Sequence, residues 1–212
     1  MIGTVVYEIL QFAGILAFAI SGALVGVRRR LDLLGVIVVG TFTGVGGGVI
    51  RDLVLGVHPP VSFVYWPNLA VAVGGSLAVF FMHPGITRIR YFEVVFDAFG
   101  LGLFSANGAA VAFASGESPL TAILVGTITA IGGGVIRDVL VNTVPGVLTR
   151  ELYAVSALTG AGLSVLLMAC GGHVILGSLV GGAVAIALRL VSVSRGWHLP
   201  KPRIAREEEH RD

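Results

Sequence analysis

Long apolar runs separated by short polar clusters dominate the chain, and several runs reach the ~20 residues that a helix needs to cross a bilayer. We predict seven transmembrane helices, with boundaries uncertain by a few residues, at about 5–27, 33–55, 67–82, 94–114, 119–141, 152–170 and 173–193. Prolines support these limits, because Pro67 and Pro119 stand where helices begin and Pro145 stands beyond the end of one. The pattern predicts an all-α integral membrane protein.

The composition agrees with a membrane protein, since 55% of the 212 residues are hydrophobic and 12% are charged. A soluble domain has about a quarter of its residues charged. No Lys or Arg precedes the first apolar run and three arginines follow it, so we expect a retained helix and no secretory signal. Cys170 is the single cysteine, which excludes an intrachain disulfide.

The basic residues predict the orientation. With the N-terminus outside, all Lys and Arg residues except Arg51 and Arg137 fall in inner connections, at the end of the last helix or in the tail. Cytoplasmic loops carry the Lys/Arg excess, so we predict an inner (plasma) membrane protein with a cytoplasmic C-terminus. Residues 1–195 would form the transmembrane domain, and residues 196–212 a disordered cytoplasmic tail. The basic charge serves orientation and contact with membrane lipid, and no nucleic acid is expected to bind.

The chain contains an internal repeat at an offset of 86 residues. Nine of twelve positions are identical between Thr41–Asp52 and Thr127–Asp138. One repeat covers about 8–82 and the other about 94–168, and the helix at 173–193 lies outside both. Three helices per repeat would insert the two copies in opposite orientations, an arrangement that places equivalent half-sites about the membrane midplane.

The most similar part of the repeats reads GGGVIRD in both copies. Three consecutive glycines disfavour a helix by roughly 1 kcal/mol each relative to alanine, and charges within the bilayer are costly and normally face a polar interior. The candidate residues for an ion path are therefore Gly46, Gly47, Gly48, Gly132, Gly133 and Gly134, with the charged residues Arg51, Asp52, Arg137 and Asp138.

A helical wheel places these residues, together with Thr43 and Thr129, on one polar half of the second and fifth helices. The two polar halves would meet across a narrow aqueous path. The alternative is that the glycines only permit tight packing and that each Arg-Asp closes a buried ion pair. The last helix carries Gly177, Gly181 and Gly182 at a spacing suited to close helix contact, either within or between subunits.

Depth in the membrane predicts partners for the two arginines. Arg137 should lie at the level of Asp97, which gives an ion pair on the cytoplasmic side. Arg51 should lie at the level of Gln11 and Glu8, which gives a weaker contact outside. Adjacent residues point about 100° apart on a helix, so Asp52 is not expected to be the partner of Arg51.

Motifs for catalysis are absent: the segment has no GxxxxGK, its glycines do not match GxGxxG, and the chain contains no HExxH, GxSxG or CxxC. We therefore expect no enzyme, no catalytic residue, no resident metal and no cofactor.

The doubled GGGVIRD, the three-plus-three-plus-one arrangement and the length resemble the prokaryotic branch of the trimeric intracellular cation (TRIC) channel family. The resemblance implies a homotrimer with one potassium-permeable pore per subunit, lined by second and fifth helices kinked at the glycine triplets. Freed carbonyls of Gly132–Gly134 would face transient K⁺, or Na⁺. The lysine-containing motif of animal members is absent. The alternatives are a secondary transporter coupled through Asp52 or Asp138, and a membrane scaffold without transport.

Overall fold

The computed structural model describes residues 2–83, 86–149 and 152–200, with side chains described for 7–83, 89–149 and 152–200. The predicted disordered tail therefore lies mostly outside the described residues, from residue 201 onward. Within the described part the chain forms nine helices and no strand. The prediction of an all-α fold is confirmed.

Seven of these helices have 16 residues or more and coincide with the predicted segments: α1 Ile2–Arg28, α2 Leu33–Val54, α4 Pro67–Met82, α5 Ile86–Ala114, α6 Pro119–Leu140, α8 Tyr153–Ala169 and α9 Val174–Arg195. The largest difference is at α5, which begins at Ile86 and not near residue 94. Two four-residue helices, α3 Val61–Val64 and α7 Gly146–Thr149, were not predicted. Five helices (α1, α2, α5, α6 and α9) are long and apolar enough to cross a membrane, whereas α4 and α8 are shorter.

Helices α2 and α6 begin in the same way. The Asp32 side chain accepts a hydrogen bond of 2.7 Å from the Gly35 amide, and the Ser118 hydroxyl accepts one of 3.1 Å from the Thr121 amide. Such side chains satisfy amide groups that have no partner inside the helix. Asp32 and Ser118 are 86 residues apart, so the repeat extends to the caps.

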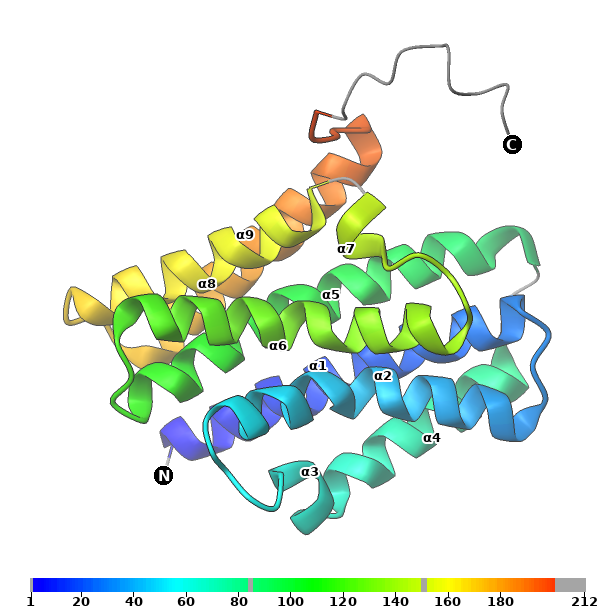
Figure 1. Ribbon diagram of the computed structural model, residues 1–212, viewed down its shortest axis with the longest axis horizontal. Helices are drawn as coiled ribbons and strands as arrows, with labels where there is room; N and C mark the ends of the chain where they lie inside the picture. Colours follow the sequence, from blue (N-terminus) through cyan, green and yellow to red (C-terminus); the bar gives the residue numbers. More distant parts are fainter. Residues whose placement is uncertain (1, 84–85, 150–151, 201–212) are drawn as a thin grey trace, which may run out of the picture.

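Successive long helices run in alternating directions along the body (Figure 1). Helix α1 packs against α2 and α4, and α5 packs correspondingly against α6 and α8. The two halves meet where α1 lies against α5 and where α2 lies against α6, and α9 lies against α8 and α5. The site described below therefore lies where the two halves join.

Two phenylalanine rings pack between α1 and α5, each against a glycine of the other helix. Phe18 of α1 fills the space above Gly100 of α5, and Phe104 of α5 fills the space above Gly14 of α1. The two rings meet edge to face with their centroids 5.4 Å apart. Because Gly14 and Gly100, like Phe18 and Phe104, are 86 residues apart, the core itself has the symmetry of the repeat.

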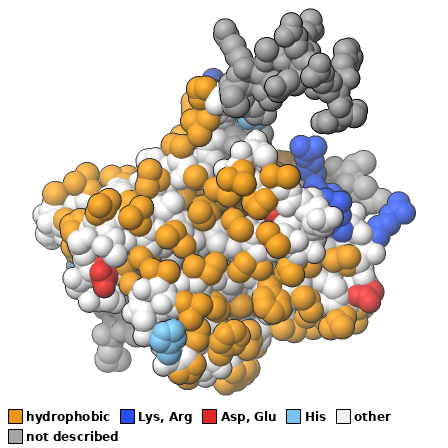
Figure 2. Space-filling view, in the orientation of Figure 1, with side chains coloured by type: hydrophobic (Ala, Val, Ile, Leu, Met, Phe, Trp, Pro, Cys, Tyr) orange, Lys and Arg blue, Asp and Glu red, His pale blue; other side chains and the backbone are white. Residues whose placement is uncertain are grey.

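The outer surface is apolar. Hydrophobic side chains cover most of the body in Figure 2, and the Lys and Arg side chains visible there lie toward the right-hand end and the upper edge. Large exposed apolar residues such as Phe42, Leu124 and Leu166 occur along the long helices. In water such a surface would drive association, whereas hydrocarbon is its natural surrounding. The surface is that of a membrane protein.

Candidate functional site: the crossing of α2 and α6

The glycine triplets bring the backbones of α2 and α6 into direct contact. A Cβ atom on Gly47 would overlap the carbonyl oxygen of Thr129, and one on Gly133 would overlap the carbonyl oxygen of Thr43. The side chain of Ile136 likewise occupies the space above Gly46, and a Cβ on Gly132 would lie 2.9 Å from Cδ1 of Ile50. At Gly47 and Gly133 only glycine permits this approach, because any side chain would meet a backbone carbonyl that cannot move alone.

The third glycine of each triplet faces elsewhere. A Cβ on Gly48 would lie 3.8 Å from Oγ of Ser62, which is an ordinary contact, and one on Gly134 would lie 2.8 Å from the Tyr153 hydroxyl oxygen. Both helices are continuous through their triplets. The kinks therefore stay a prediction, and the tight-packing alternative accounts for two glycines in each triplet.

Thr43 and Thr129 are fully buried, and both hydroxyls bond within their own helices. Thr43 donates to the Val39 carbonyl, and Thr129 donates to the Val125 carbonyl at 2.6 Å. Their side chains lie against Gly22 of α1 and Gly108 of α5, respectively. The small, polar half of α2 is thus shared among α1, α3 and α6. In this conformation the two backbones touch where the polar halves meet, so an aqueous path between them stays a prediction.

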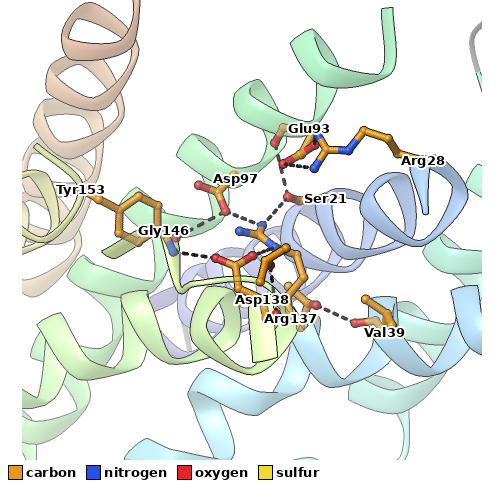
Figure 3. A network of polar contacts seen from close by, with 11 residues as sticks. Ser21, Arg28, Val39, Glu93, Asp97, Arg137, Asp138, Gly146 and Tyr153 are labelled. Atoms are coloured by element: carbon orange, nitrogen blue, oxygen red, sulfur yellow. Dashed lines mark hydrogen bonds and ion pairs between the residues drawn. The ribbon is translucent and has the colours of Figure 1, made fainter. Parts of the chain in front are cut away.

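Arg137 is the centre of a buried polar network at one end of the crossing (Figure 3). Its Nη1 lies 2.7 Å from Oδ1 of Asp97 and donates to the Ser21 hydroxyl at 2.9 Å, while its Nε donates to Oδ1 of Asp138 at 2.9 Å. Arg137 and Asp97 are 1% and 0% exposed, so the pairing has little competition from water. The Arg137–Asp97 ion pair is the one that the depth argument predicts.

The network extends to two further helices. The Tyr153 hydroxyl donates to Oδ1 of Asp97 at 3.3 Å, and the guanidinium carbon of Arg189 lies 4.9 Å from the centre of the Tyr153 ring. A cation at that distance over an aromatic face is attracted by the ring quadrupole. On the other side, Ser21 donates to the backbone carbonyl of Glu93, whose carboxylate pairs with Arg28 at 2.8 Å. The Arg137 network therefore joins α1, α5, α6, α8 and α9.

At the other end of the crossing the predicted partners of Arg51 are wrong. Both Nε and Nη2 of Arg51 donate to Oδ1 of Asp52, at 2.9 and 2.8 Å. Gln11 instead accepts a hydrogen bond of 2.8 Å from the Asn107 amide, and Glu8 is exposed. The helical-wheel argument fails because the long arginine side chain folds back to its neighbour, and Arg137 reaches Asp138 in the same way.

Each aspartate of the Arg-Asp pairs also holds a short helix. Oδ2 of Asp52 accepts from the Val61 amide at 2.8 Å, at the start of α3, and Oδ2 of Asp138 accepts from the Gly146 amide at 2.7 Å, at the start of α7. Pro60 occupies the position 86 residues before Gly146 and has no N–H, so the donor in the first half is the next residue. Both oxygens of both carboxylates are therefore occupied by groups of the protein.

Sequence reasoning missed Ser21, Asn107, Tyr153 and Arg189 as members of these clusters. Arg189 was expected at the cytoplasmic end, yet it is 1% exposed. A signal was available, because Gly182, Ala185, Arg189 and Ser192 follow one another at helical spacing on the buried face of α9. Gly181 lies on that face too, where Oγ of Ser164 and the Gly160 carbonyl fill the space beside it, so its contact is within the chain.

The sequence family described as "Glycine transporter" matches twice, over residues 8–84 and 94–169, which are the two stretches related by the repeat. The chain is 40% identical over 197 residues to a UPF0126 membrane protein of Deinococcus radiodurans, covering 92% of this chain and 91% of the relative. It is 36% identical over 209 residues to the UPF0126 inner membrane protein YadS of Escherichia coli K12, covering 95% and 98%.

Solved structures of cation channels also match this chain in fold and sequence. A TRIC cation channel solved to explain conductance has a TM-score of 0.85 and 38% identity, covering 93% of this chain and 98% of that one. The TRIC channel orthologue from Rhodobacter sphaeroides also has a TM-score of 0.85 and 38% identity, covering 90% and 98%. The fold and the paired site thus define a membrane protein of the cation-channel class. The chain belongs to the TRIC family, which is the family matched under the description above.

Proposed function

We propose that this protein is a potassium-permeable, monovalent cation channel of the inner membrane that works as a homotrimer with one pore in each subunit. The observation that carries the proposal is the likeness to TRIC cation channels, at 38% identity over nearly the whole fold. The family and fold are those of channel proteins and not of enzymes. The solved orthologue is trimeric, which supports the homotrimer.

In the proposed topology seven helices cross the membrane, with the N-terminus outside and the two three-helix repeats inverted. The alternating directions of the long helices support it. Helix α2 then runs outward and α6 runs inward, so the Gln11–Asn107 and Arg51–Asp52 groups lie toward the outer side. The Arg137 network lies toward the cytoplasm. Buried polar groups at both levels are costly in a membrane and typical of a permeation path.

The conformation described here corresponds to a closed pore in this proposal. The direct contact of Gly47 with Thr129 and of Gly133 with Thr43 leaves no room for an ion between the two backbones at the crossing. Opening would separate the two helices at this crossing or bend them at the triplets, which would turn the carbonyls of Gly46–Gly48 and Gly132–Gly134 toward a dehydrating K⁺. Glycine triplets suit such a change because they add no side chain that must be moved.

A secondary transporter is the second candidate, since the matched family is described as "Glycine transporter". In that case Asp52 or Asp138 would bind the coupling proton or sodium ion. The geometry opposes this role, because each aspartate already bonds to an arginine through one oxygen and to a backbone amide through the other. A coupling carboxylate needs an oxygen that is free to exchange its ligand.

Potassium flux from liposomes that contain the purified protein tests the proposal. The wild type should release K⁺ without any imposed sodium or proton gradient. Gly48→Leu should reduce the flux, because a large side chain in the triplet would hinder the proposed bend of α2, and the variant should still fold because Gly48 touches no backbone at the crossing. Gly74→Leu is the matched control, since nothing lies within 4 Å of a Cβ at Gly74. Glycine uptake that depends on an ion gradient, with no passive K⁺ flux, would favour the transporter.

A further inference from the structure

A pocket of about 280 Å³ opens at the end of the molecule where α1 begins, outside the Arg137 network. Tyr7, Glu8, Gln11 and Phe12 of α1 form one wall. Val61 of α3, the following Tyr65 and Asn68 of α4 form the other. The amide of Val61 is held by Oδ2 of Asp52, so the second wall is fixed to the end of α2.

One polar group in this pocket has no partner within the described chain. Asn68 is 1% exposed, and its Oδ1 accepts no hydrogen bond there. A buried amide oxygen without a partner is unfavourable, so a ligand that donates a hydrogen bond to it would stabilise the complex. Gln11 Oε1 is also available in part, since it accepts one bond, from Asn107, and has a second lone pair.

The charge and the aromatic groups of the lining favour a cation. Glu8 contributes a carboxylate, and no Lys, Arg or His is among the described residues that line the pocket. Three aromatic side chains, Tyr7, Phe12 and Tyr65, line it as well, and the rings of Phe12 and Tyr65 lie 6.2 Å apart at an angle of 33°. Faces of such rings attract cations that come within about 6 Å.

We propose that this pocket binds a small primary alkylammonium ion. Glu8, Gln11 and Asn68 each offer a carboxylate or amide oxygen to one of the three N–H donors of a primary ammonium group. The aromatic rings and Val61 then surround the alkyl part. These four side chains suit an alkyl group better than a bare alkali ion, which takes oxygen ligands in place of its water.

The same chemistry distinguishes an amine from an amino acid. Glycine carries the same ammonium group, but its carboxylate would lie beside Glu8 without a cation to receive it. Arg51 of α2 already pairs with Asp52, and none of the described residues that line the pocket is Lys, Arg or His. A simple amine should therefore bind more tightly than glycine, and the inference stands whether or not the protein conducts ions.

Isothermal titration of the purified full-length protein with n-butylammonium chloride, at constant sodium chloride, tests this inference. The wild type should bind saturably, with one site per chain. Glu8→Gln should weaken binding about tenfold, because it removes the negative charge of the lining and leaves an amide oxygen in its place. Glu117→Gln, which removes an exposed carboxylate that does not line the pocket, should bind like the wild type. Unchanged binding by Glu8→Gln, or no saturable binding by the wild type, overturns the proposal.

Two further comparisons sharpen the test. Glycine, tetramethylammonium (which has no N–H) and potassium chloride should each compete with n-butylammonium at least about tenfold more weakly. Equal competition by any of them contradicts the assignment to a primary ammonium ion. Asn68→Leu should also weaken binding. Since Asn68 is buried and the variant could fail to fold, Tyr65→Leu at an exposed ring provides the second variant, with weaker binding expected and unchanged binding counting against the pocket.

Discussion

The two ends of the α2–α6 crossing are built on the same plan and differ in charge. At each end an arginine folds back onto the next aspartate, and that aspartate holds the start of a four-residue helix. At the Arg137 end, which is the inner end in the proposed topology, the arginine has a second carboxylate partner, Asp97. Gln11 stands at the equivalent place 86 residues earlier, at the outer end, and bonds to Asn107. The inner serine, Ser21, corresponds in turn to Asn107.

The extra carboxylate at the inner end is matched by an extra cation. Arg189 belongs to α9, the helix that has no counterpart in the repeat, and it reaches Asp97 through Tyr153. At the outer end the positive charge of Arg51 is already balanced by the negative charge of Asp52. Both halves therefore share the Arg-Asp contact to a short helix, whereas the additional charges Asp97 and Arg189 occur at one end and balance each other, as burial in a membrane requires.

Removing the added carboxylate should have the largest effect. Asp97→Ala leaves Arg137 with one carboxylate, and breaking a buried ion pair by removing one partner costs ~3–5 kcal/mol. Gln11→Ala at the equivalent outer position removes a neutral hydrogen bond and should cost about 1–3 kcal/mol. Unfolding in detergent, followed by tryptophan fluorescence and by the fraction of protein that stays monodisperse, measures both. Equal losses would contradict the asymmetry.

Replacing a glycine at the α2–α6 crossing by alanine should lower the stability of the protein equally in either half. Gly47→Ala and Gly133→Ala each place a methyl group against a backbone carbonyl of the other helix, and overpacking of this kind typically costs about 1–3 kcal/mol. Gly74→Ala and Gly162→Ala are matched controls, because a Cβ at either position meets nothing within 4 Å. The same unfolding assay should rank both crossing variants below both controls. Normal stability of either crossing variant would show that the contact is looser than described.

The smallest predicted effect concerns the balance of the added charges. Arg189→Met should cost about 0.5–2 kcal/mol, the range for a cation–π contact. If Asp97 and Arg189 form a balanced pair through Tyr153, Arg189→Met combined with Asp97→Asn should cost less than the sum of the single substitutions. A double-mutant cycle measures this coupling. Strict additivity would mean that Arg189 serves only the packing of α9.

The long helices could be predicted from the sequence because a membrane-spanning helix needs a long, apolar run of residues. The predicted limits of α4, 67–82, are the observed ones. Depth along the helices was enough to pair Arg137 with Asp97. Depth alone could not pair Arg51, because the outcome depends on how a flexible side chain folds back and on the competing Gln11–Asn107 bond. The four-residue α3 and α7 escaped prediction because one turn has no periodicity to detect.

The glycine triplets show a second limit. Their spacing predicted a special role for α2 and α6, yet it did not distinguish a path for ions from a contact between backbones. That choice depends on which neighbour each glycine faces: Gly47 meets a backbone carbonyl of α6, whereas Gly48 meets Ser62 beside α3. A helical wheel assigns both residues to the same half, because it does not include the neighbouring helices.

Single-channel recording of the purified full-length protein in planar bilayers tests the central claim most directly. The account predicts discrete openings in potassium chloride, with a reversal potential near that of K⁺ in asymmetric salt, and long closures that reflect the direct contact of α2 with α6. Purified, monodisperse protein that gives no unitary openings in either orientation, but transports glycine at carrier rates, would contradict it.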